Sequence, residues 1–135
     1  MGSNILSRRE TFMAIFLPMT GTVLSIRAFH HLLGVHHVYI SGHIVRHLFS
    51  GVLLLIPSAF VVAFGTPYRW LAILIRMTIG ISSGMILDEI VFLIVTQGGD
   101  NDYLSGISLG GSAAFIFLAT LMLWILSVVF ENKNS

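Results

Sequence analysis

The side chains that could do chemistry are collected in two short stretches of this sequence. All six histidines fall within residues 30–47, and four of the six acidic residues fall within residues 88–102. Imidazole and carboxylate together suit zinc, iron or manganese as ligands. The chain has no cysteine, so thiolate metal sites and cysteine nucleophiles are excluded. If the two stretches meet in space, these residue types predict a site for a divalent metal ion.

Three of the histidines have the spacing of one helical face. If a helix already begins near Val35, His36, His43 and His47 lie within about 20° of one line along its surface, at about 100° per residue. His43 and His47 are four residues apart, the spacing at which two imidazoles on one helix can bind a single ion. We therefore expect His43 and His47 to be the central metal ligands and His36 to join them.

Asp88 and Glu89 lie within the apolar run 84–95. They are adjacent, so they point about 100° apart on a helix and at most one faces the same centre as the histidines. An unpaired carboxylate in a bilayer costs at least about 2.5–3.5 kcal/mol, so each needs a water-filled cavity or a partner, which can be a histidine, Arg27 or Arg46. We expect one of them to complete the metal site, with Glu89 as a catalytic base if a metal-bound water is activated. Ion-paired packing is the alternative.

Other polar residues are expected to lie outside the site. The segment Asp100–Asp102 has the first residues of a calcium loop but lacks its glycine and its distal glutamate. It is interpreted as a solvated turn, with Asp102 or Ser105 capping the helix that follows. The headgroup boundary is the expected place for the remaining histidines, His30, His31 and His37.

The composition predicts the elements that must position these groups. Of 135 residues, 56% are hydrophobic and only 10% are charged, too few to cover a water-soluble globule. A spanning helix needs roughly 20 apolar residues, which leaves room for four spans and short loops. The spans are expected at about 11–33, 39–64, 70–96 and 105–130. We therefore predict an all-α integral membrane protein, a single transmembrane domain over residues 1–135 that forms an up-down-up-down four-helix bundle.

Four spans place both termini on one side of the membrane. Arg8, Arg9, Arg69 and Lys133 fall on that side, whereas Arg27 and Arg46 fall toward the other, so the termini are expected in the cytoplasm and the chain in the inner membrane. The histidines and the acidic pair then meet at the outer face. Helix contacts are expected at small residues, such as Gly80, Ser83 and Gly84, or alternatively Gly106, Gly110 and Gly111.

Two resemblances concern the same segments. His43–His47, HIVRH, resembles one H-x3-H box of the membrane di-iron desaturases and hydroxylases, although no H-x2-H-H box follows it. The segments HHLLGVHHVYISGH, GMILDEIVFL and DNDY are similar to those of a group of small bacterial and archaeal membrane proteins of unassigned function. That resemblance implies that the histidines and the acidic pair belong together, and it implies no activity.

The leading hypothesis is a histidine-rich membrane metal site near the outer face, with a lipid or an amphiphile as the substrate if the chain is an enzyme. A proton or metal-ion transporter or channel subunit is the alternative, and it predicts a homo-oligomer because one small bundle encloses little space. A b-type haem protein and a purely structural subunit are further classes. A net charge of +1 gives no basic tract for nucleic acid, and the lipid bilayer is the expected partner.

Overall fold

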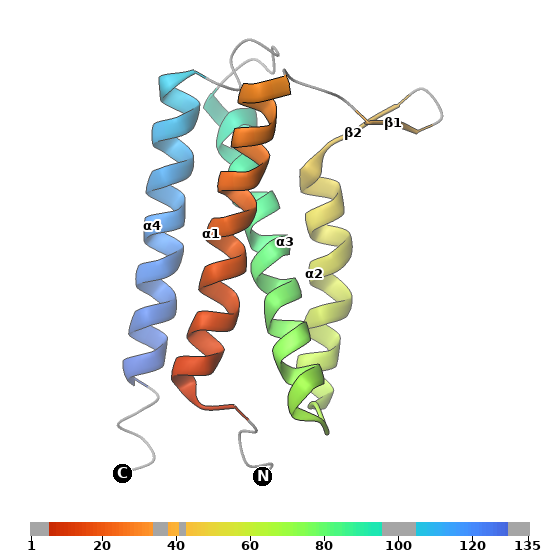
Figure 1. Cartoon of the computed structure of the whole chain (residues 1–135), viewed down its shortest axis with the longest axis vertical. Coiled ribbons are helices and arrows are strands. Elements are labelled where there is room, and N and C mark those ends of the chain that lie inside the picture. The colour runs from red at the N-terminus through yellow and green to blue at the C-terminus, as the bar shows by residue number, and fades with distance from the viewer. Residues whose placement is uncertain (1–5, 34–37, 41–42, 96–104, 130–135) are drawn as a thin grey trace.

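The computed structural model consists of four long helices and a short β-hairpin (Figure 1). It describes residues 6–33, 38–40, 43–95 and 105–129. The elements are α1 (Arg8–Leu33), β1 (Val38–Ile40), β2 (His43–Val45), α2 (His47–Phe64), α3 (Arg69–Val95) and α4 (Gly106–Val129). Each of the four helices is long and apolar enough to cross a membrane, as the sequence predicts.

Successive helices run in opposite directions, which gives the up-down-up-down order (Figure 1). Helix α3 packs against each of the other three, and α4 packs also against α1. The end of the bundle where α1 and α3 begin is named the terminal end, and the end where α2 and α4 begin is named the histidine end. Because α1 ends and α2 begins at the histidine end, the buried polar groups of α1, α2 and α3 can meet there.

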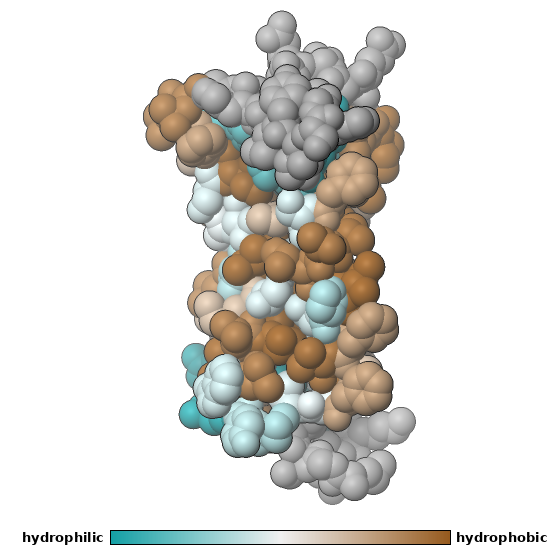
Figure 2. Space-filling model, turned by 90° about the vertical axis from the view of Figure 1, so that its right-hand side faces the viewer, coloured by the Kyte–Doolittle hydropathy of each residue, from teal (hydrophilic) through white to brown (hydrophobic). Residues whose placement is uncertain are grey.

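Hydrophobic side chains cover most of the outside of the bundle. Figure 2 shows brown, hydrophobic side chains over much of one face, with the strongest teal near the two ends. Large apolar side chains on every helix are exposed, among them Leu24, Phe60, Ile94 and Phe117. A surface of this kind is stable against lipid chains and not against water. The helices therefore belong in a membrane.

The predicted start of the second span, near residue 39, is wrong. The structure has β1 and β2 in this region, paired antiparallel with Tyr39 opposite Ile44, and α2 begins only at His47. The described strands are rich in β-branched residues, which favour extended backbone. The prediction that His36, His43 and His47 lie on one face of a helix is also wrong. His43 lies in strand β2, and only His47 lies in helix α2.

Helices α1 and α3 approach each other through glycine. A Cβ atom on Gly84 would lie 2.6 Å from the backbone oxygen of Met19, and one on Gly80 would meet the backbone of Ile15. This confirms Gly80 and Gly84 as contact residues. The alternative group does not make such a contact at Gly106 or Gly110, since a Cβ on either would have nothing within 4 Å among the described residues.

Side-chain caps fix two helix starts. Before α1, the Ser7 hydroxyl accepts from the amide of Glu10, and the Glu10 carboxylate accepts from the amide of Ser7, which forms a capping box. Before α4, the Ser105 hydroxyl accepts from the amide of Ser108 at 3.3 Å. The predicted cap at Ser105 is thereby confirmed.

Candidate functional site

A buried ion pair joins α1 to α3 below the histidine end. The Arg27 Nε donates to Asp88 Oδ1 at 2.6 Å, and the two side chains are 9% and 1% exposed. Asp88 lies seven residues before the end of α3, about 10 Å along the helix axis. An unpaired charge at that depth in a membrane is costly, so the charges of Arg27 and Asp88 each offset the cost of burying the other.

Two serines of α4 complete this pair. A terminal guanidinium nitrogen of Arg27, Nη2, donates to Ser112 Oγ at 2.7 Å. The same nitrogen lies 3.2 Å from the hydroxyl oxygen of Ser108 and 3.4 Å from its carbonyl oxygen. The Ser112 hydroxyl in turn donates to the backbone oxygen of Asp88 at 3.3 Å. One guanidinium therefore ties three helices together. We name Arg27, Asp88, Ser108 and Ser112 the arginine network.

Glu89 faces another helix. Its Oε2 accepts from the amide of Leu48 at 2.7 Å, in the first turn of α2. Arg46, which precedes that turn, provides no side-chain cap of its own. A carboxylate is favourable at this position because unpaired amides give a helix N-terminus partial positive charge. Glu89 therefore holds α2 against α3.

Arg46 makes a looser pair with the same carboxylate. Its Nη1 lies 3.5 Å from Glu89 Oε1, and its side chain is 27% exposed. Its guanidinium carbon also lies 5.4 Å from the ring centre of Phe92, within cation–π range. The distances indicate that Glu89 is held more firmly by the α2 amide than by Arg46.

Two histidines meet beside these groups. His30, near the end of α1, and His47, the first residue of α2, have ring centroids 5.6 Å apart at an interplanar angle of 77°. His30 is buried, with 4% of its surface exposed, and His47 is half-buried. The structure thus brings imidazoles of two different helices into contact.

The other predicted site residues are placed as follows. His36 lies outside the described residues, and for His43 the structure describes only a backbone position in β2. Asp88 and Glu89 diverge as their adjacency predicts, one toward Arg27 and the other toward Arg46. Within the described part of the chain, no three histidine or acidic side chains form a group that could hold a metal ion.

Sequence reasoning missed His30, Ser108 and Ser112. His30 is in phase with the buried residues of α1, which are Met19, Val23 and Arg27. That spacing of three and four residues was a usable signal. The serines gave no such signal, because serines are common in apolar helices and their partner depends on how α4 is rotated.

Comparisons of this chain with models of protein families, with characterised proteins and with solved structures found no match. The resemblance to small bacterial and archaeal membrane proteins therefore stays a prediction. Function has to be argued from the geometry of the arginine network and of the groups around Glu89.

Proposed function

We propose that this chain is a multipass membrane protein whose histidine end binds a divalent metal ion. The observation that carries the proposal is the contact between His30 and His47. Two imidazoles that each place a nitrogen about 2.0–2.1 Å from one ion have ring centres roughly 5 to 6 Å apart. The observed 5.6 Å falls in this range.

Glu89 is the carboxylate of the proposed site. One of its oxygens is occupied by the Leu48 amide, while the other makes only the long contact with Arg46 among the described residues. Movement of the partly exposed Arg46 side chain would release that oxygen for a cation. The proposed ligands are therefore His30, together with the predicted His36, His43 and His47. Asp88 is not a ligand in this proposal, because it is paired with Arg27 and positions the helices.

Imidazole and carboxylate without thiolate suit zinc, iron or manganese. Where one coordination position stays open, such an ion would activate a bound water for hydrolysis. A site at this depth favours a lipid or an amphiphile as the substrate. Catalysis is a second step of the proposal, and it depends on the first.

The test is the metal content of the full chain, purified without added metal or chelator. We expect about one equivalent of zinc, iron or manganese per chain. A His30→Ala/His47→Ala variant should lose it and Glu89→Gln should lower it. His31→Ala is the matched control, because His31 follows His30 but is exposed.

Wild-type chain that is folded but free of stoichiometric metal would overturn the proposal. So would equal loss of metal in His31→Ala, since that would indicate binding by loose surface histidines. Asp88→Asn in a folded chain should keep its metal, which separates the proposed ligand Glu89 from its neighbour.

A structural role is the second candidate function. The observation that favours it is the set of hydrogen bonds that Arg27 makes to Asp88, Ser108 and Ser112, because a buried polar network of this kind fixes helix positions without a ligand. If the folded wild-type chain contains no metal, the structural role is the better-supported function. Transport of protons or metal ions stays a prediction.

A further inference from the structure

Arg46, at the histidine end, has guanidinium donors that no described residue uses. Its Nη1 lies 3.5 Å from Glu89 Oε1, and its guanidinium carbon lies 5.4 Å from the ring centre of Phe92. Its Nε and Nη2 make no hydrogen bond to any residue that the structure describes. The side chain is 27% exposed, so a ligand can approach it from outside the bundle.

Arg46 also lies close to the lipid headgroups. It directly precedes α2, which has 18 residues and is therefore about 27 Å long. That length is close to the thickness of the hydrocarbon core of a bilayer, about 30 Å, so the residue before the first turn lies near the headgroup boundary. The anion that this layer supplies in quantity is the lipid phosphate.

A metal ion would change the charge balance around Arg46. This step rests on the proposed function, in which Glu89 binds the ion. An ion bound to Glu89 Oε1, about 2.0–2.2 Å from that oxygen, would lie at most about 6 Å from Arg46 Nη1. Arg46 would then lose the only carboxylate that it contacts in the described part of the chain, and would face a second cation. An anionic group in contact with both cations would offset their repulsion.

We infer that Arg46 binds the phosphate group of the ligand of the proposed metal site. Arginine suits phosphate because its planar fork of N–H groups can donate two parallel hydrogen bonds. A phosphate has further oxygens with which it can contact the metal ion at the same time. The inference narrows the proposed substrate class from a lipid or amphiphile to a molecule that carries phosphate.

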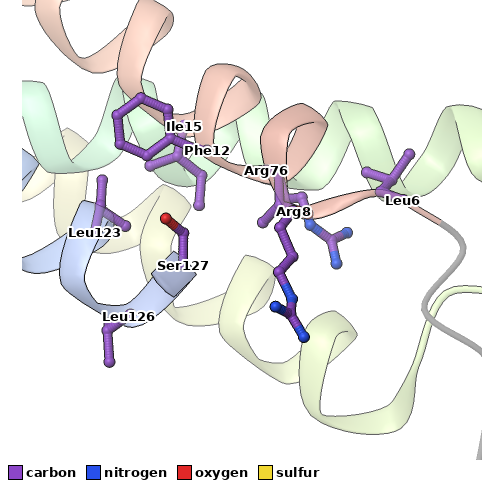
Figure 3. A pocket seen from close by; sticks show the side chains of 9 residues that line it. Leu6, Arg8, Phe12, Ile15, Arg76, Leu123, Leu126 and Ser127 are labelled. Atoms are coloured by element: carbon purple, nitrogen blue, oxygen red, sulfur yellow. The ribbon is translucent and has the colours of Figure 1, made fainter. Parts of the chain in front are cut away.

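A second place with arginines lies at the terminal end, the opposite end of the helices from Glu89. A pocket of about 280 Å³ between α1, α3 and α4 is lined by Arg8 and Arg76 together with apolar side chains (Figure 3). The affinity of a lipid bound there would not depend on a metal ion at the histidine end. Dependence on the metal therefore identifies a ligand of Arg46.

The test is the binding of radiolabelled phosphatidic acid to the full chain in neutral detergent, measured by gel filtration. Metal is first removed with a chelator, and one equivalent of zinc is then restored. We expect zinc to raise the affinity of the wild type for phosphatidic acid about tenfold, and the lipid to raise the affinity for zinc by the same factor. Arg46→Gln should keep its metal and lose most of this gain, and Arg46→Lys should recover part of it.

Arg9→Gln is the matched control, because Arg9 carries the same charge but is exposed at the terminal end. It should keep the full gain, and an equal loss in Arg9→Gln would overturn the inference in favour of diffuse attraction. Full gain in Arg46→Gln would overturn it too. If Arg46→Gln fails to fold, a full gain in folded Arg46→Lys together with unchanged affinity of the wild type on adding zinc overturns the inference, and a gain in the wild type that Arg46→Lys reduces supports it.

Competition identifies the source of the phosphate. Unlabelled diacylglycerol with the same acyl chains should not displace phosphatidic acid, and displacement by it would overturn the inference. Displacement by millimolar inorganic phosphate would assign the Arg46 site to free phosphate, and retention of the lipid would assign it to a headgroup.

The two proposals fail separately. Wild type that holds stoichiometric metal but binds phosphatidic acid equally with and without it would overturn the phosphate inference and leave the metal site standing. Folded wild type that takes up no zinc would overturn both.

Discussion

Two neighbouring carboxylates have different surroundings in this bundle. Asp88 is buried against Arg27 and the serines of α4, whereas Glu89 caps α2 and touches a partly exposed Arg46. Their divergence follows from the roughly 100° between consecutive helical residues. Asp88 therefore holds helices together, and Glu89 is the carboxylate that the proposed metal site uses.

Replacing only one partner of the Arg27–Asp88 pair should lower the free energy of unfolding far more than replacing both partners with apolar residues. Arg27→Met leaves Asp88 charged and buried, and we expect a loss of about 3–5 kcal/mol in the free energy of unfolding. Arg27→Met/Asp88→Leu should recover at least half of that loss. Unfolding of the full chain by denaturing detergent, followed by tryptophan fluorescence, measures both.

The control for this measurement is the exposed pair of Arg69 and Glu10, whose side chains are 63% and 40% exposed. Arg69→Gln should cost less than about 1 kcal/mol. A cost for Arg27→Met as small as that for Arg69→Gln would contradict the assignment of the arginine network as a stabilising element.

The sequence was sufficient to name Arg27 and Arg46, with the histidines, as candidate partners of the two carboxylates, but not to assign each pair or to show the role of α4. A charged residue in an apolar run has few possible partners, so Arg27 and Arg46 could be named in advance. Ser108 and Ser112 could not, since a serine in a membrane helix costs little whether or not it has a partner.

At the scale of elements, length and composition predicted the helices well and failed at the hairpin. The predicted boundaries of the first, third and fourth spans agree with α1, α3 and α4 to within a few residues. The failure at residues 39–46 has a simple cause, because strands of three residues are too short to show an alternating pattern, and an apolar run before a helix resembles its continuation.

The close approach of α1 and α3 gives a prediction at this scale. Gly84→Ala should lower the free energy of unfolding by about 1–3 kcal/mol, because its Cβ would press on the Met19 backbone and force the helices apart. Gly110→Ala in α4 has open space around the new methyl group. It should leave stability unchanged or raise it by up to about 1 kcal/mol.

The same detergent unfolding experiment compares the two alanine variants. Equal stabilities for Gly84→Ala and Gly110→Ala would mean that α1 and α3 are not in backbone contact.

At the scale of the whole molecule, four spans fix which segments share a side of the membrane. Because the chain has no cysteine, single cysteines can be placed without background labelling. In intact cells, Ser105→Cys should react with a membrane-impermeant maleimide, whereas Ser7→Cys and Thr66→Cys should react only after permeabilisation. This pattern follows from an even number of spans together with the excess of arginine at the terminal end.

Labelling of Ser7→Cys and Thr66→Cys from opposite sides would contradict the four-span topology. The reverse pattern, with both labelled in intact cells, would keep the topology and invert the proposed orientation.

The central position of α3 also has a consequence for biosynthesis. Arg27 and Asp88 are 61 residues apart, so at about 5–20 residues per second the ribosome makes the arginine roughly 3 to 12 s before its counter-ion. During that interval α1 carries a cation for which the nascent chain offers no carboxylate at the right depth. Until α3 arrives, α1 therefore carries the insertion cost of an unpaired arginine, at most about 2.5–3.5 kcal/mol, and pairing with Asp88 removes it.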